Sequence, residues 1–385
     1  MATPSSGNPI SFGDIESEFG QASGTRSIGK YVDTWDYGDY EAPLDRGPNG
    51  GTSTPTVKSN VKFSDFYSRE LNIVTDFYTG GTEYRKDANT RYNDVVPDTS
   101  PPQNGAKVVG PAGSDYGNGS VSPPSNGGGK RVIISVNKDI GSEVTTDTGA
   151  GDAGEQKVAL KTGTGWAAGT ELFIHVGNNG FISGAGGNGG NGGGSEGTAP
   201  SGSNATSGLG IQWNGTVVDV INNGKITHGY PGGGGGGGAW AEREEWFGGP
   251  KKSISGNGGG GGAGIPGGAG GSTGNTGGAG SRDNAGEGGP YSSNTGDFSV
   301  YGGAGGDGGW SGGGNGGAGY AGGGGWTGGE TEDTETGGGG PAGAGRGAAI
   351  RKVSGVGWSF GTGHVTNNVV GEGKDGSSES PTGVS

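Results

Sequence analysis

Aromatic residues that lie among carboxylates are the side chains in this sequence best suited to chemistry. They gather in the segments 239–255, 281–301 and 326–336, where acids such as Glu242 and Glu330 accompany them. An aromatic ring can stack on the face of a sugar while a nearby carboxylate accepts hydrogen bonds from the hydroxyl groups. The candidate binding residues, in and between these segments, are Trp240, Trp246, Phe247, Tyr291, Tyr301, Trp310, Tyr320 and Trp326.

Some of these residues have a second interpretation. Trp310, Tyr320 and Trp326 border glycine tracts, and they fit equally well as packing groups that seal the ends of those tracts. The acids Glu242, Glu244 and Glu245 are also residue types that a glycan-cleaving enzyme uses in pairs. The sequence contains no nucleophile elbow between a strand and a helix, no Walker loop and no dinucleotide fingerprint on a βαβ unit. We therefore predict a non-enzymatic protein without catalytic residues.

The sequence offers little for a metal or a cofactor. It has three histidines and no cysteine, and a structural or surface role is favoured for His175 and His228. The stretch 302–307 resembles one calcium-binding β-roll repeat, but Gly309 stands where an apolar residue should follow. We predict no cofactor and no metal site, while the acidic loops leave calcium open.

Charge and hydropathy exclude several partners. The formal net charge is −14 and the pI is near 4.6, which argues against nucleic-acid binding and against docking on an anionic membrane. No apolar run approaches the roughly 18 residues of a membrane span, so no membrane insertion is expected. The first residues show neither a charged nor an apolar region of a secretory signal.

Glycine tracts flank the segments that carry the aromatic residues. Glycine makes up 104 of the 385 residues, and it often repeats in threes, as in 186–194 and 302–310. Three residues per turn is the period of the left-handed polyproline II helix, which has no internal hydrogen bonds. Such helices must bond to neighbouring helices or to water, and missing side chains let backbones approach closely. The tracts therefore predict laterally bonded polyglycine II helices.

Two phrases that precede glycine tracts look like copies of each other. The stretches 173–184 and 218–229 each contain a β-branched run, an Asn-Asn-Gly turn and a second short run, and a glycine tract follows each. The runs 131–136 and 158–162 are also typical of strands. A repeat of this kind predicts that each strand–turn–strand unit stacks on the next.

The front of the chain is irregular. Within it, 10–16 resembles 61–67, and each phrase predicts a short helical turn with Ser11 or Ser64 near its start and acids in its first turn. Chance similarity of two short phrases is the alternative. The stretch 122–129 has the composition of a linker.

We accordingly predict a mostly β and irregular fold in four parts. Residues 1–129 form a loop-rich attachment region, 130–176 a β-strand region, 177–350 a polyglycine II sandwich with variable distal loops, and 351–385 a C-terminal tail.

These features together resemble the glycine-rich adhesins at the tips of long tail fibres in T-even-type tailed bacteriophages, and related tail-fibre proteins. The resemblance covers roughly 172–370 and rests on the two Asn-Asn-Gly phrases, the interrupting segments and the glycine tracts that begin at Gly186, Gly232, Gly256, Gly302 and Gly337. The front phrases 10–20 and 61–67 also look like phrases near the start of phage tail proteins. The long front section departs from the family, which leaves the attachment partner open.

The resemblance implies a virion protein that binds a host receptor through loops on a polyglycine II scaffold. Residues 1–129 would attach to other tail or fibre proteins, and the loops would bind a host envelope glycan or an outer-membrane protein. One copy could cap a trimeric fibre, or the chain could form its own oligomer, such as a homotrimer. Two other functions stay open, a purely structural baseplate or fibre component and a glycine-rich ice-binding protein.

Overall fold

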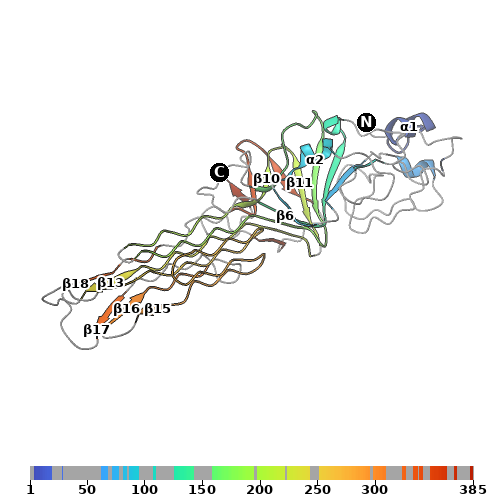
Figure 1. Ribbon diagram of the computed structural model, residues 1–385. Helices are drawn as coiled ribbons and strands as arrows, with labels where there is room; N and C mark the ends of the chain where they lie inside the picture. The colour runs from blue at the N-terminus through green and yellow to red at the C-terminus, as the bar shows by residue number, and fades with distance from the viewer. Residues whose placement is uncertain are drawn as a thin grey trace.

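A computed structural model of the 385 residues describes most of the chain from 125 onward and shorter pieces before it. The described residues are 4–19, 28, 62–67, 72–77, 81–84, 86–94, 107–109, 125–142, 158–194, 197–221, 223–242, 251–294, 298–308, 323–326, 333–336, 338–340, 347–361, 368–370 and 382–384. They form an elongated body in which a group of β-sheets leads into a long bundle of glycine-rich segments (Figure 1).

Three sheets form the first part of this body. The largest has the order β20-β11-β8-β5-β1-β4, from Trp358–Phe360, Thr216–Val220, Glu171–Val176, Arg131–Val136, Asn72–Phe77 and Lys107–Val109. The second has the order β22-β19-β10-β7-β3, from Thr382–Val384, Ile350–Lys352, Ser207–Ile211, Val158–Lys161 and Lys86–Asp87. The third has the order β2-β6-β9-β12-β21, from Glu83–Tyr84, Asp139–Gly141, Phe181–Ser183, Lys225–Thr227 and Val369–Val370.

The chain winds through these sheets as a coil. Strands β5, β6 and β7 enter the three sheets in turn, and β8, β9 and β10 repeat that order one layer further along. Each strand pairs in parallel with its counterpart in the next layer, and only β4 pairs antiparallel within these sheets. Each turn of chain therefore stacks on the previous one, and long loops can leave at the corners.

The predicted repeat is confirmed by the register of two layers. Phe173 pairs with Val217 on β8 and β11, and Phe181 pairs with Lys225 on β9 and β12. The side-chain amide of Asn223 donates to Oδ1 of Asn178 at 2.8 Å, so the two Asn-Asn-Gly turns also stack. The two phrases therefore take equivalent positions in consecutive turns of the coil.

The hydrophobic core consists of apolar side chains at alternate positions of the strands. On β5, Val132, Ile134 and Val136 belong to the buried apolar cluster, and equivalent positions on β8 and β11 continue it layer by layer. Side chains of a strand alternate between the two faces of its sheet, so every second residue of these β-branched runs points into the coil. Stacked apolar rows of this kind explain why runs such as 131–136 form parallel strands.

The front section contributes to the same sheets. Strands β1, β2 and β3 form the first layer, and α2 (Ala88–Asp94) follows β3 directly. On α2, the ring of Tyr92 packs against that of Trp166 with centroids 5.3 Å apart, and burial raises the pKa of the Tyr92 hydroxyl. A short 3-10 helix, η4 (Ser125–Gly127), lies beside α2 and leads into β5.

An ion pair ties the first layer to the second. The ammonium of the buried Lys138 lies 2.8 Å from a carboxylate oxygen of Glu83. Burial of the Glu83 carboxyl favours its neutral form, but the bonds from Lys138 and Lys86 outweigh this effect and leave its pKa lowered. The carboxylate of Glu83 is therefore ionised and compensates the positive charge of the buried Lys138 ammonium.

Two helical turns stand at the start of the chain, as predicted. They are α1 (Phe12–Phe19) and η2 (Phe63–Phe66), and the rings of Phe12 and Phe63 pack edge to face at 4.9 Å. Ser11 and Asp14 exchange side-chain and backbone hydrogen bonds, and these bonds from the Ser11 hydroxyl and N–H lower the pKa of Asp14. In η2 the equivalent first position belongs to Lys62, whose N–H donates to Asp65, while Ser64 lies inside the turn.

The glycine bundle consists of the described segments 184–194, 197–206, 229–238, 256–265, 266–272, 275–281, 286–289 and 303–308. It arises from two insertions into the coil, one between β9 and β10 and a long one between β12 and β19. Figure 1 shows these segments running side by side away from the sheets. The bundle is therefore formed by two of the connections that lead from the third sheet to the second sheet.

Hydrogen bonds between the segments repeat every third residue. The N–H groups of Gly187, Gly190 and Gly193 donate to the carbonyls of Tyr230, Gly233 and Gly236 at 2.8–2.9 Å. The residues just before these donors, at 186, 189 and 192, donate in the same way to 266, 269 and 272. This period of three is the one that the glycine tracts predict, and it directs successive backbone groups to different neighbours.

The segment 256–265 is surrounded by other segments of the bundle. Its N–H groups donate to three neighbours, 184–193, 275–281 and 303–306, and its carbonyls accept from three more, 230–236, 268–271 and 286–289. All N–H groups from 256 to 262 and all carbonyls from 257 to 263 take part in these bonds. A buried backbone without regular helix or strand pairing is thus fully satisfied.

Asn257, in the segment 256–265, has a polar side chain that nevertheless fits inside the bundle. It is fully buried, its Nδ2 donates to the carbonyl of Gly303 at 2.9 Å, and its Oδ1 accepts from the N–H of Asn275 at 2.7 Å. An amide side chain can donate and accept at once, so it links two neighbouring segments where an apolar side chain would leave polar groups unpaired.

The fold is mostly β and irregular with a few short helices, as predicted. The three sheets draw strands from both sides of the predicted boundaries at 176 and 351, because β9 to β12 and β19 to β22 join the same layers. Whether the four predicted parts behave as separate domains stays a prediction.

Candidate functional site

Two small antiparallel sheets stand at the end of the glycine bundle farthest from α1 (Figure 1). The first has the order β14-β13-β18, from Lys251–Ile254, Ala239–Glu242 and Asp333–Thr336. The second has the order β15-β16-β17, from Ser292–Asn294, Phe298–Gly302 and Gly323–Trp326. We call them the tip sheets. All three interrupting segments of the sequence contribute strands to them.

The tip sheets lie against each other. Strand β13 approaches β16 and β17, β14 approaches β15 and β16, and β17 approaches β18. This order of contacts is that of two aligned sheets, each of which has one face toward the other sheet and one face away from it. Alternation along each strand then assigns every residue to an inner or an outer face.

On the first tip sheet, Trp240 belongs to the outer face. It pairs with Ser253 on one neighbouring strand and with Glu335 on the other. Ser253 is exposed, whereas Ala239, the preceding residue on β13, is fully buried. Two residues further along, Glu242 pairs with Lys251 and Asp333 on the same face as Trp240.

On the second tip sheet, Tyr301 and Trp326 belong to opposite faces. Tyr301 pairs with Ser293, which is exposed, so both lie on the outer face. Trp326 pairs with Phe298, which shares its face with the buried Gly302. Both sequence interpretations of Trp326 stay predictions.

Tyr291 directly precedes β15 and is 55% exposed. Its assignment as a contact residue stays a prediction.

The other candidates fall elsewhere. Trp246, Phe247, Trp310 and Tyr320 lie outside the described residues, as do Glu244 and Glu245. Their assignment as contact residues stays a prediction.

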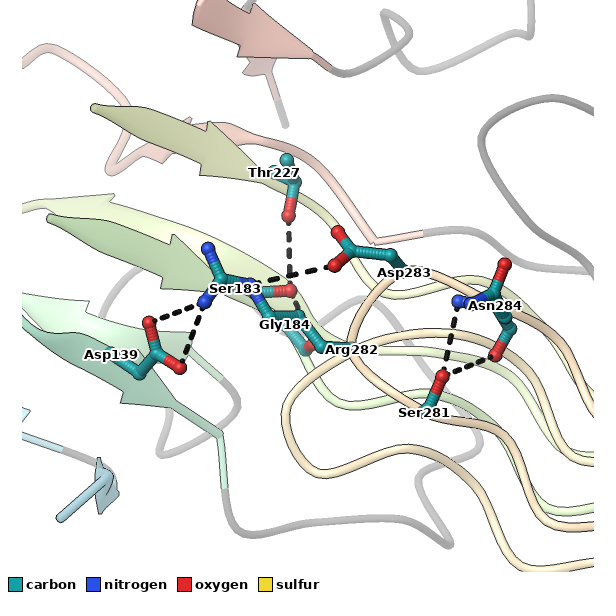
Figure 2. A network of polar contacts seen from close by, with 8 residues as sticks. All are labelled: Asp139, Ser183, Gly184, Thr227, Ser281, Arg282, Asp283 and Asn284. Atoms are coloured by element: carbon teal, nitrogen blue, oxygen red, sulfur yellow. Dashed lines mark hydrogen bonds and ion pairs between the residues drawn. The ribbon is translucent and has the colours of Figure 1, made fainter. Parts of the chain in front are cut away.

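The other end of the bundle is fastened to the third sheet by Arg282 (Figure 2). Its Nη1 lies 3.0 and 3.1 Å from the two carboxylate oxygens of Asp139 on β6. Its guanidinium carbon also lies 3.9 Å from the ring centroid of Phe181 on β9, a cation–π geometry. The loop at 281–284 is closed by the N–H of Ser281, which donates to the carbonyl of Asn284 at 2.7 Å.

No pattern in the sequence predicts this contact between the bundle and the third sheet. The segment 281–301 reads as one polar interruption, but its first residues lie at the sheets and its last residues at the tip. Asp139 is 143 residues away from Arg282, and neither residue belongs to a motif.

A row of serine, histidine and aspartate crosses the largest sheet. His175 pairs with Ser135 on β5 and with Asp219 on β11, so the residue types of a nucleophilic triad lie side by side. Ser135 is 0% exposed and the other two are 4% exposed. A nucleophile must reach its substrate, so burial of this degree favours a structural role for the row.

The described part of the chain has neither a metal-binding cluster nor a membrane-spanning helix. No group of three or more His, Cys, Asp or Glu side chains there is arranged to hold a metal ion. None of the helices in that part is long and apolar enough to cross a membrane.

Comparison with known proteins gives one similar structure. No family model and no curated protein matches the chain. A similar solved structure is the gp37-gp38 adhesin tip complex of the long tail fibre of bacteriophage S16, with 19% identity and a TM-score of 0.31 over 79% of this chain and 88% of that one. What this chain binds has to be inferred from its own residues.

Proposed function

We propose that the protein is a bacteriophage tail-fibre adhesin, located in the virion tail, that contacts a host cell-surface receptor with its tip sheets. In this proposal the glycine bundle is a polyglycine II scaffold, and the front section attaches the chain to other tail or fibre proteins. The chain acts by binding and not by catalysis. Its receptor is a molecule of the bacterial envelope.

One observation carries the proposal: strands from all three segments that interrupt the glycine tracts meet in two small sheets, at the end of the bundle far from α1. The bundle between them has few side chains and a dense set of lateral hydrogen bonds. A rigid frame that presents variable segments at one end is a common way to build a binding surface. An attachment site at one end and a contact site at the other is the layout that an adhesin needs.

The test uses the full chain, labelled with a fluorophore, and a panel of bacterial strains. Residues 239–254, 291–302 and 323–336 are exchanged for those of a related chain with a different set of target strains. We expect the set of strains that the protein labels to follow the exchanged residues. A control exchange of residues 4–19 should leave that set unchanged.

Other outcomes would support other functions. If the intact chain labels no strain, yet is incorporated into tail particles through its front section, it is a structural virion component. Thermal hysteresis in a solution of the purified chain would instead indicate an ice-binding protein. Labelling that is unchanged by the tip exchange would remove the receptor assignment from the tip sheets.

A further inference from the structure

The backbone hydrogen bonds of the glycine bundle do not by themselves determine how far one segment is shifted along the next. The N–H of Asn257 donates to the carbonyl of Gly303 at 3.1 Å. Three residues later, the N–H of Gly260 donates to the carbonyl of Gly306 at 2.9 Å. A shift by three residues would therefore present the same kind of donors to the same kind of acceptors. Glycine-rich chains slip for this reason, because few side chains distinguish one register from another.

Such a shift would displace the two tip sheets relative to each other. The segment 256–265 follows β14 of the first tip sheet, and the segment 303–308 follows β16 of the second. With the rise of a polyproline II helix, a shift by three residues corresponds to about 9 Å along the bundle. The surface that the two tip sheets present together therefore depends on a single register of the segments below them.

The side chain of Asn257 bonds to the segments that lead to both strands of the β15–β16 pair. Its Nδ2 donates to the carbonyl of Gly303, which directly follows β16, at 2.9 Å. Its Oδ1 accepts from the N–H of Asn275 at 2.7 Å. Nδ2 of Asn275 in turn donates to the carbonyl of Pro290, two residues before β15, at 3.0 Å. Since Asn257 itself lies three residues after β14, one buried amide connects the two tip sheets at their bases.

The room for this side chain is specific to its position. At Gly258 and Gly260 an added side-chain carbon would meet a backbone carbonyl far inside van der Waals contact, whereas Gly289 leaves space beside the Asn257 Cβ. A shift in one direction would bring Asn257 to the place of Gly260, which the carbonyl of Gly286 blocks. A shift in the other direction would take the amide away from its partners and leave buried polar groups unpaired. Both are costly.

Other polar side chains of the bundle do not select one register in this way. Asn188 and Asn191 lie three residues apart, and their Oδ1 atoms accept from the N–H groups of Ala269 and Ser272, each at 2.9 Å. A shift by three residues would keep one of these two bonds, and water can replace bonds at the exposed Asn191. Thr206 is buried, but it directly precedes β10, where the pairing of the sheet already determines the register.

We propose that Asn257 is a positioning residue that sets the register of the glycine bundle and thereby aligns the two tip sheets for receptor contact. A single buried asparagine has a comparable role in coiled coils, where it specifies a register that apolar contacts leave open. The part of this inference that concerns receptor contact rests on the proposed function. The alignment of the sheets can be measured without a receptor.

The experiment measures the distance between the tip sheets in the full chain. The sequence has no cysteine, so Ser253→Cys on β14 and Ser293→Cys on β15, both at exposed positions, place one nitroxide label on each sheet. Double electron–electron resonance gives the distribution of distances between the labels. It is recorded with Asn257 present, in Asn257→Gly, and in the control Asn191→Gly, which also removes an amide that bonds to a neighbouring segment.

We expect one narrow distance when Asn257 is present and in Asn191→Gly. In Asn257→Gly a second distance should appear, because loss of the amide bonds raises the slipped population at least about tenfold. Glycine fits the bundle, so the melting temperature of this variant should fall by less than about 5 °C. Without the nitroxide labels, its binding to a strain that the protein recognises should fall in proportion to the fraction of molecules at the original distance.

Three results would overturn the inference. An unchanged single distance in Asn257→Gly would show that other contacts set the register, and an equal second distance in Asn191→Gly would show that the position of the asparagine is not specific. Loss of amide protection at 258–262 in Asn257→Gly would show that the residue supports folding instead of alignment. If the chain binds no strain at all, the receptor proposal fails, while the distances still decide whether Asn257 sets the register.

Discussion

At Gly259 an added side-chain carbon would meet two backbone carbonyl oxygens, those of Gly233 and Gly234, far inside van der Waals contact. The N–H of Gly259 donates to the carbonyl of Gly190 at 2.8 Å, and its own carbonyl accepts from Gly271 at the same distance. The neighbours are backbone atoms held by their own bonds, so they cannot move aside as a flexible side chain would. The absence of a side chain is therefore a packing requirement at this residue.

We predict that Gly259→Ala lowers the stability of the protein by about 3 kcal/mol, because overpacking forces two segments of the bundle apart. The melting temperature, followed by circular dichroism, should fall by roughly 5–10 °C. The control is Gly194→Ala, where an added carbon meets nothing within 4 Å and no change of more than about 1 °C is expected. Equal melting temperatures for the two variants would contradict the packing of the bundle described above.

At the scale of elements, the junction between bundle and sheets depends on a short loop. Arg282 joins that loop to β6 through Asp139 and to β9 through Phe181 (Figure 2). The N–H of Gly264 also donates to the carbonyl of Ser281 at 3.0 Å, so the loop is bonded to the central segment of the bundle. The loop therefore links the sheets, through one side chain, to the segment that the rest of the bundle surrounds.

We predict that Arg282→Ala frees the loop while leaving the bundle folded. An exposed ion pair and a cation–π contact together contribute about 1–2 kcal/mol, so the amides of Ser281 and Gly264 should exchange with deuterium about tenfold faster. Arg282→Lys should have an intermediate effect, because lysine keeps the charge and loses the planar fork.

A neighbouring carboxylate provides the control for this measurement. Asp283 lies 3.8 Å from Nε of Arg282 and is 66% exposed. Asp283→Ala should leave the exchange rates nearly unchanged, since an exposed pair at that distance contributes little. If both variants exchange alike, Arg282 does not fasten the loop.

In the tip sheets, the pairing of the strands determines which residues share a face of the sheet. In the sequence, Trp326 has two interpretations, as a binding or a packing residue, whereas Trp240 and Tyr301 are candidates for binding alone. In the structure, Trp240 pairs with Glu335, Tyr301 with Ser293 and Trp326 with Phe298. The face of the sheet on which each residue lies depends on strand parity, which changes with a single residue of register.

At the scale of the whole molecule, the stability of the glycine bundle depends on its hydrogen bonds. Glycine loses more backbone entropy on folding than any other residue, and the bundle has few apolar side chains to compensate. Its segments are bonded mutually, so a single segment has little reason to stay ordered without its neighbours. The bundle should accordingly fold and unfold as one unit with high cooperativity.

We predict that the amides of residues 256–262 are among the most protected in the chain. Each donates inside the bundle, so they should exchange only when the bundle opens as a whole. Amides of 4–8, near the start of the chain, should exchange orders of magnitude faster. Hydrogen–deuterium exchange followed by mass spectrometry of peptides measures both, and exchange of 256–262 within seconds would show a mobile coil instead of a bundle.

Short-range sequence patterns were sufficient to predict the local geometry of this protein. The three-residue glycine period predicted lateral bonding every third residue, and the two Asn-Asn-Gly phrases predicted stacked strand–turn–strand units. Both predictions depend on short-range patterns, which fix local geometry. The alternating β-branched runs predicted strands for the same reason, whereas Lys62 at the start of η2 shows that a cap position can depart from the expected residue type.

Which segments are neighbours could not be predicted from such patterns and is known from the three-dimensional fold alone. Glycine tracts carry almost the same local information, so nothing in their residues states that 256–265 is central or which segments surround it. The pairing of Arg282 with Asp139 and the inner or outer position of each tip aromatic likewise depend on contacts across long stretches of chain. Such choices follow from how the whole set of backbone hydrogen bonds can be satisfied at once, and no local pattern encodes that condition.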